Sequence, residues 1–78
     1  MNTGLLWFDN DPHTALLDKV ERAADFYQRK YGRVPDMCLV HPSMLGTHTS
    51  QVLGKPQKVE VRAHRAIRPG HFWIGEDN

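Results

Sequence analysis

The chain has 78 residues, a net charge of +1 and 40% hydrophobic residues, which predicts a single folded domain over residues 1–78 and argues against a disordered chain. No apolar run is long enough for a transmembrane span or a signal-peptide core, so we expect no membrane partner and a cytoplasmic location. The single Cys38 cannot form an intramolecular disulfide, which fits a reducing compartment.

The first predicted element is a short strand over residues 4–9. Residues 5–8 form a continuous apolar run, Leu-Leu-Trp-Phe, as in strands that are covered on both faces, and this predicts a central place in the sheet. Asp9, Asn10 and Asp11 follow at once. We interpret them as turn and capping residues, with acid–base or metal chemistry as the weaker alternative.

A helix over residues 12–31 is the clearest element in the sequence. Asp11 can cap its first N–H groups, Pro12 suits the first helical position, and Gly32 suits a left-handed C-terminal cap. Its apolar residues fall on one stripe: Leu16, Leu17, Val20, Ala23, Ala24, Tyr27 and Tyr31.

The flank of this helix is one candidate binding surface. It gathers Lys19, Arg22, Phe26 and Lys30 beside the apolar stripe. The alternative is that Phe26 only folds over the edge of the core, since single apolar residues are common on protein surfaces.

Residues 37–41 form the second predicted strand, which Pro42 ends. A strand, a helix and a strand in this order predict two parallel strands with the helix on one face of the sheet. Cys38 is then a core residue and not a nucleophile. Residues 42–57 have the composition of a long loop.

The C-terminal part is predicted as a hairpin. Residues 59–68 alternate in polarity, Pro69-Gly70 is a turn signal, and residues 72–75 return as the partner strand, with residues 76–78 as a solvated tail. The outer face of this hairpin is the main candidate binding surface, and it gathers Arg62, His64, Arg68, His71 and Trp73.

The predicted fold is therefore a small α+β domain in the order β-α-β-long loop-β-β, with one long helix packed on a sheet of three or four strands. Phosphate-binding loops, dinucleotide fingerprints, nucleophile elbows and paired Cys-x-x-Cys motifs are all absent from the sequence. We therefore expect no catalytic residues and no cofactor.

The five histidines are candidate metal ligands. In the predicted hairpin His64 and His71 lie about 13 Å apart, too far for two ligands of one zinc ion. A site that joins His41, His48 and one hairpin histidine is the weaker alternative, so the sequence predicts no metal.

The function predicted first is a non-catalytic protein-interaction module, with a protein partner or self-association. The alternative is binding of single-stranded nucleic acid by the basic and aromatic segment 55–73, where five Lys and Arg residues accompany Glu60 alone. A metal-dependent hydrolase is a distant third.

Overall fold

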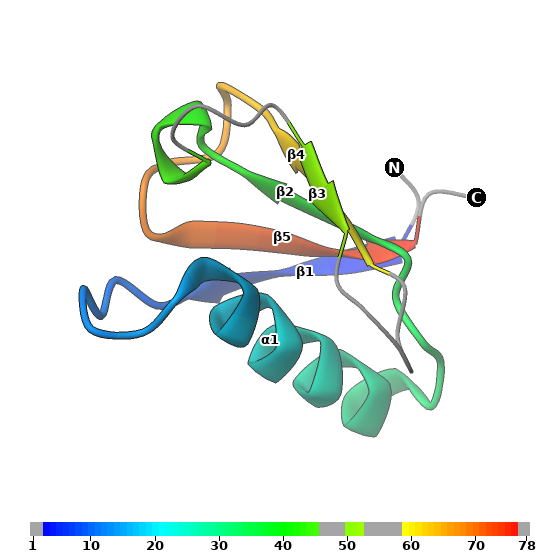
Figure 1. The fold of residues 1–78 in the computed structure, drawn as a ribbon. Helices are drawn as coiled ribbons and strands as arrows, with labels where there is room; N and C mark the ends of the chain where they lie inside the picture. Colours follow the sequence, from blue (N-terminus) through cyan, green and yellow to red (C-terminus); the bar gives the residue numbers. More distant parts are fainter. Residues whose placement is uncertain (1–2, 46–49, 53–58, 77–78) are drawn as a thin grey trace.

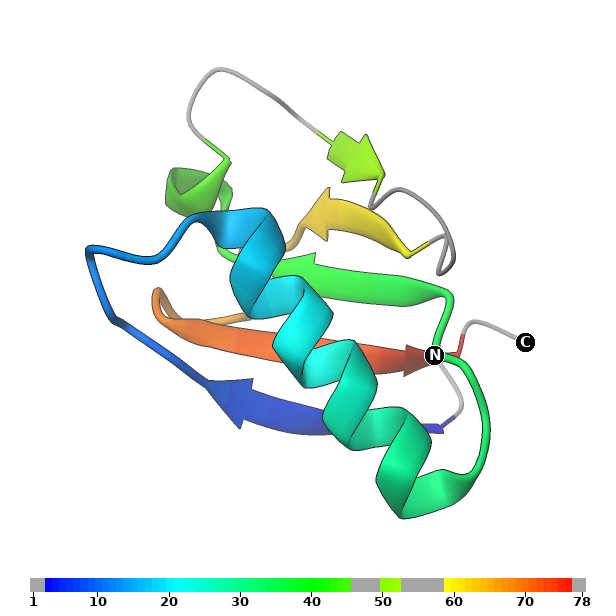
Figure 2. The same ribbon diagram turned by 60° about the horizontal axis from the view of Figure 1, so that its bottom comes forward.

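A computed structural model describes residues 3–45, 50–52 and 59–76 of the chain. One helix, α1, packs across one face of a β-sheet, so the predicted α+β class is confirmed (Figures 1 and 2). The elements in chain order are β1 (Thr3–Phe8), α1 (Leu16–Tyr31), β2 (Met37–Val40), the short 3-10 helix η1 (Pro42–Met44), β3 (Ser50–Val52), β4 (Glu60–Ala63) and β5 (His71–Glu76).

The sheet has five strands in the order β1-β5-β2-β4-β3. β5 is antiparallel to both β1 and β2, which makes β1 and β2 parallel, as predicted, with β5 between them. β2 and β4 are parallel, and β3 pairs antiparallel with β4. The expected central place of β1 is wrong, because β1 forms one edge of the sheet.

The predicted hairpin of β4 and β5 is also wrong. β4 ends at Ala63, and β2 lies between β4 and β5 in the sheet. Residues 64–70 instead carry the chain past the end of β2, through turns closed by the Ile67 N–H to His64 carbonyl bond and the His71 N–H to Arg68 carbonyl bond. The Pro-Gly signal does mark a turn, since Gly70 has φ 85°, but this turn leads into a strand that is not the neighbour of β4.

The segment 42–57, expected as a loop, contains η1 and the short edge strand β3. His41 starts η1, and its Nδ1 accepts a bond from the Ser43 N–H at 3.1 Å. His48 and the remaining residues of this segment, 46–49 and 53–57, lie outside the described residues.

Helix α1 begins four residues later than the sequence predicted, at Leu16. Asp11 does not cap α1 but closes a separate turn before it. Its carboxylate accepts hydrogen bonds from the His13 N–H at 2.9 Å and the Thr14 hydroxyl at 2.8 Å. The C-terminal end is as predicted, because Gly32 has φ 69° and its N–H donates to the Gln28 carbonyl at 2.8 Å.

The core lies between α1 and the sheet face that α1 covers. The fully or nearly buried members of this cluster are Val20, Ala23, Ala24, Tyr27, Cys38, Val40, Leu45, Val59, Val61, Phe72 and Ile74. The strands thus contribute alternate residues to the core, as the pleat requires.

Glu76 belongs to this layer as well, which corrects its expected place in a solvated tail. It is buried at the end of β5, where its carboxylate accepts a 2.5 Å bond from the Tyr27 hydroxyl and pairs with the Arg33 guanidinium at 2.8 Å. Burial, and then the hydrogen bond to this carboxylate, raises the pKa of Tyr27 to about 12. The hydrogen bond from Tyr27 and the ion pair with Arg33 offset the cost of burying this carboxylate.

Candidate functional site

The surface that stands out is the free face, defined as the sheet face opposite α1. Alternation places Leu6 and Phe8 of β1, Trp73 of β5 and Arg62 of β4 on this face. In the register of the sheet, Leu6, Trp73, Leu39 and Arg62 form one row across four strands. Apolar and basic side chains therefore share one surface, which lies on the opposite side of the sheet from α1.

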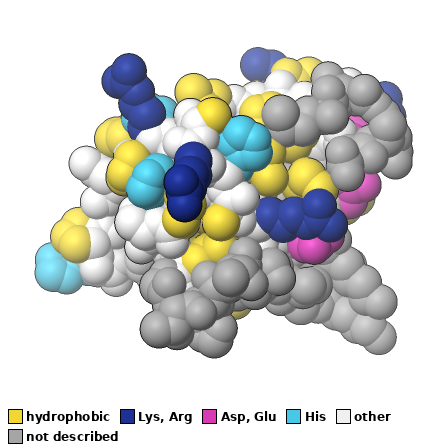
Figure 3. Space-filling model, turned by 90° about the horizontal axis from the view of Figure 1, so that it is seen from above, with side chains coloured by type: hydrophobic (Ala, Val, Ile, Leu, Met, Phe, Trp, Pro, Cys, Tyr) yellow, Lys and Arg dark blue, Asp and Glu magenta, His cyan; other side chains and the backbone are white. Residues whose placement is uncertain are grey.

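Two large apolar side chains of this face are open to solvent. Leu6 is 61% exposed and Phe8 is 58% exposed, whereas Leu39 in the middle of the face is 5% exposed. Figure 3, seen from the side away from α1, shows hydrophobic side chains lying among Lys, Arg and His side chains. An apolar surface with a polar rim is typical of interaction sites.

Trp73 is half-buried because it lies along its own sheet. A Cβ atom built at Gly4 would come within 2.2 Å of Trp73 Cζ2, and one at Gly75 within 2.7 Å of Trp73 Cη2. The two glycines face each other across β1 and β5, so they leave the space that the indole occupies. Trp73 thus forms part of the free face and not of the core beneath α1.

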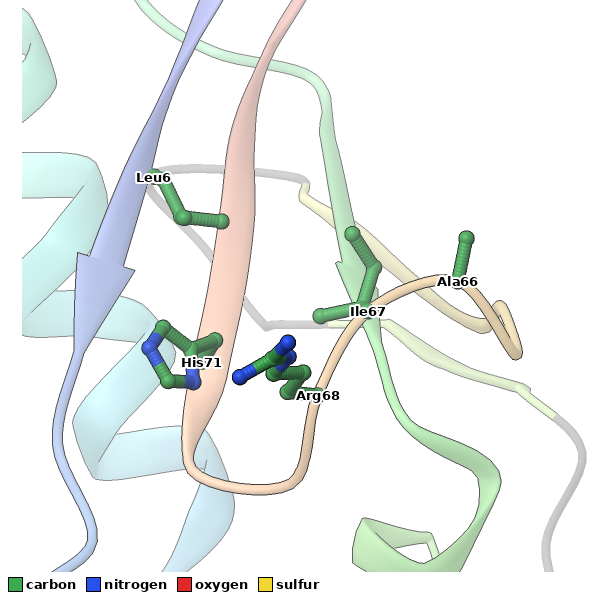
Figure 4. A pocket seen from close by; sticks show the side chains of 5 residues that line it. All are labelled: Leu6, Ala66, Ile67, Arg68 and His71. Carbon is green, nitrogen blue, oxygen red and sulfur yellow. The ribbon is translucent and has the colours of Figure 1, made fainter.

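A shallow pocket of about 350 Å³ opens between β1 and the segment that leads into β5. Figure 4 shows its five lining residues, with the Arg68 side chain directed toward His71. The lining residues are Leu6, Ala66, Ile67, Arg68 and His71. The pocket therefore combines aliphatic walls with one cationic group.

The polar groups around this pocket differ in what they contact. No described carboxylate pairs with the Arg68 guanidinium. The His71 ring packs on Phe8 with centroids 4.8 Å apart, and its buried Nδ1 has no hydrogen-bond partner among the described residues. His64 Nδ1 accepts a bond from the Ala66 N–H at 3.2 Å, which holds the turn before the pocket.

At the far side of the free face, Arg62 is engaged by Glu60. Arg62 donates to the Glu60 carboxylate from Nε at 2.7 Å and from Nη2 at 3.0 Å. The hydrogen bond from Arg62 lowers the pKa of Glu60. The opposite charges of Arg62 and Glu60 offset each other, whereas Arg68, which lines the pocket, is an exposed cation.

The outer-face set predicted from the sequence is thus only partly brought together. Arg62, His71 and Trp73 lie on the free face, and Arg68 lines its pocket, although the hairpin that led to them does not exist. His64 follows β4 and serves the turn.

The helix-flank set is not one accessible surface. Lys19 is buried, and its Nζ donates to the Asp9 carbonyl at 3.2 Å and lies 3.9 Å from the Asp9 carboxylate. Phe26 packs on Trp7 with centroids 5.1 Å apart, and Lys30 lies 5.6 Å from the Tyr31 ring. Arg22 is exposed on the same helix.

Leu6, Phe8 and Ile67 are the surface residues that the sequence reasoning missed. The apolar run of β1 was the signal, because such a run places side chains on both faces of a strand. The apolar run predicts burial on both faces of β1, whereas only Leu5 and Trp7 pack toward the core and Leu6 and Phe8 are exposed.

The other chemical groups of the chain offer little reactivity. Burial raises the pKa of the Cys38 thiol to about 12, which leaves it protonated at neutral pH. Across residues 3–45, 50–52 and 59–76, no group of three His, Cys, Asp or Glu residues could hold a metal ion. In the same ranges no helix has the length and apolar character to cross a membrane.

No protein family matches this sequence, and neither the curated proteins nor the solved structures compared with it gave a significant match. The candidate site therefore depends on the geometry of this chain alone.

Proposed function

We propose that this protein is a non-catalytic protein-interaction module that binds a partner with the free face of its sheet. The observation that carries this proposal is the exposure of Leu6 and Phe8 beside a pocket whose Arg68 pairs with no carboxylate among the described residues. Apolar side chains that are this exposed add little to the free energy of unfolding of the isolated domain. A partner that covers them would remove apolar area from water, at about 25 cal/mol per Å².

The charge of the free face indicates the chemistry of the partner. Arg68 is exposed and lines the pocket together with Leu6, while the Glu60 carboxylate accepts hydrogen bonds from Arg62. A partner with an aliphatic side chain next to a carboxylate fits this arrangement, because the aliphatic group can enter the pocket and the carboxylate can pair with Arg68.

The experiment is photocrosslinking in cells that express the protein. A p-benzoylphenylalanine at Ala66, an exposed residue of the pocket rim, should form an adduct with another polypeptide. The same group at Glu21, exposed on α1, is the matched control and should form none. Arg68→Glu should reduce the adduct at position 66. Equal adducts at both positions, or none at position 66, would refute the proposal.

Binding of single-stranded nucleic acid is the second candidate. It is favoured by two aromatic rings, Phe8 and Trp73, on the face that also carries Arg62 and Arg68. A short single-stranded oligonucleotide should then quench Trp73 fluorescence, and its affinity should fall steeply with salt. Trp73→Ala should cost about 1–3 kcal/mol of binding. An absence of binding at low salt would remove this candidate.

A further inference from the structure

The open edge of β1 is the second unpartnered feature of the sheet. β1 is an edge strand of six residues, and from Thr3 to Phe8 it contains no charged residue and no proline. Sheet edges in proteins are usually protected by charge, proline or a bulge, because their free N–H and C=O groups pair readily with another strand. Among the side chains of β1, none supplies such protection.

The direction of the backbone groups in β1 follows from its neighbours. The Asp9 N–H donates to the Gly70 carbonyl at 2.9 Å, so the backbone groups of Asp9 are directed toward the β5 side of β1. Backbone groups alternate along a strand, and Gly4, Leu6 and Phe8 must therefore point the other way, to the open edge. No backbone bond of these three residues to any other described segment is found.

Leu6 and Phe8, two of these three residues, also have their side chains on the free face. If a second β1 approached antiparallel about a two-fold axis at Leu6, each Leu6 would face Leu6 of the other copy. Each Phe8 would then face Gly4 of the other copy, and all of these residues would pair through their open backbone groups. The large Phe8 side chain would face a glycine over which the Trp73 indole lies, so two apolar rings would meet in this register.

The face covered by α1 is also compatible with this pairing. In the same register Trp7 faces Leu5 of the other copy, so apolar residues meet on both faces. Figure 2 shows that α1 crosses the sheet diagonally and lies beside β1 with its C-terminal half. Phe26 and Tyr31 of that half are 43% and 38% exposed.

We propose that two copies of this chain pair through β1 into one continuous antiparallel sheet, with Leu6 at the two-fold axis. The proposal deepens the interaction function, because it names a second copy as one partner. It uses the edge of β1, whereas Ala66, Ile67 and Arg68 of the pocket lie on the segment before β5; Leu6 is common to the two surfaces. Six backbone hydrogen bonds, two for each facing pair of Gly4, Leu6 and Phe8 residues, would close the edge.

The test is a charge exchange at Leu6, measured by sedimentation equilibrium on the full chain. Leu6→Asp and Leu6→Lys each place two like charges opposite one another at the axis, so each variant alone should be monomeric. We expect a rise of at least about tenfold in the dimer dissociation constant. An equimolar mixture of the two variants should restore dimers, because opposite charges then meet.

Controls keep the two proposals separate. Glu21→Lys, an exposed change on α1, should leave the dimer intact, and far-UV circular dichroism should show that both Leu6 variants are folded. A monomeric wild-type chain at high concentration, a dimer unaffected by the Leu6 changes, or a mixture that stays monomeric would each overturn the pairing. None of these results depends on the crosslinking measurement at position 66, so the two proposals can fail independently.

Discussion

The two faces of the sheet are built from the same strands but differ in what covers them. On the covered face Phe72, Ile74, Cys38 and Val40 are fully buried beneath α1. On the free face Leu6 of β1 is 61% exposed and Trp73 of β5 is half-buried. Within the described residues, α1 covers one of two sheet faces that both carry apolar side chains.

This difference separates the residues that stabilise the fold from the residues to which we assign the proposed binding. Apolar burial on the covered face stabilises the fold, whereas apolar exposure on the free face contributes little to the isolated domain. The exposed residues therefore indicate binding more strongly than the buried ones. Changes on the two faces should accordingly have unequal effects on stability.

The largest contrast is expected between two phenylalanines. Phe72→Ala removes a fully buried ring and should cost about 3–5 kcal/mol of unfolding free energy. Phe8→Ala removes a ring that is 58% exposed and should cost about 1 kcal/mol or less, chiefly its contact with His71. Urea unfolding of both variants in the Leu6→Asp background, where dimers are absent, measures this contrast. Similar losses for both would show that the free face is part of the core.

A smaller effect is expected from the buried hydroxyl of Tyr27. Tyr27→Phe leaves the Glu76 carboxylate with Arg33 as its remaining charged partner, and should cost about 1.5–3 kcal/mol at neutral pH. Tyr31→Phe, an exposed position four residues on, is the matched control and should cost much less.

The pH dependence of stability tests the same tyrosine. Its pKa is raised from 10.0 to about 12 in the folded chain, so its contribution is complete below pH 10.0 and is lost as pH rises toward 12. The wild-type chain should therefore lose more unfolding free energy than Tyr27→Phe between neutral pH and pH 11. Parallel losses in the two proteins would contradict the raised pKa.

The smallest effect is expected at Gly4, beneath the Trp73 indole. Gly4→Ala must displace this ring, which is half-exposed and can move, so we expect a cost of about 1 kcal/mol and a change in Trp73 fluorescence. Gly75→Ala should cost more, about 1–3 kcal/mol, because its Cβ would meet the Thr3 carbonyl at 2.2 Å. An unchanged emission spectrum in Gly4→Ala would show that Trp73 does not lie there.

Part of the site could be predicted because strand alternation is local. Arg62, His71 and Trp73 lie on the free face, as predicted. Within one strand, residues two positions apart, such as His71 and Trp73, have their side chains on the same face. Their partners across the sheet could not be predicted. Leu39 of β2, and not a hairpin neighbour, lies between Trp73 and Arg62, because β2 enters the sheet between β5 and β4.

The sequence alone determined the α+β class, the apolar stripe and C-terminal cap of α1, and the parallel direction of β1 and β2. These features depend on residues within one turn, one strand or one connection, where spacing and side-chain chemistry act directly. Only the tertiary structure decided the strand order, the burial of Glu76 and the edge position of β1. Those depend on which distant strands pair, and an apolar run such as residues 5–8 is equally compatible with a central strand and with an edge strand.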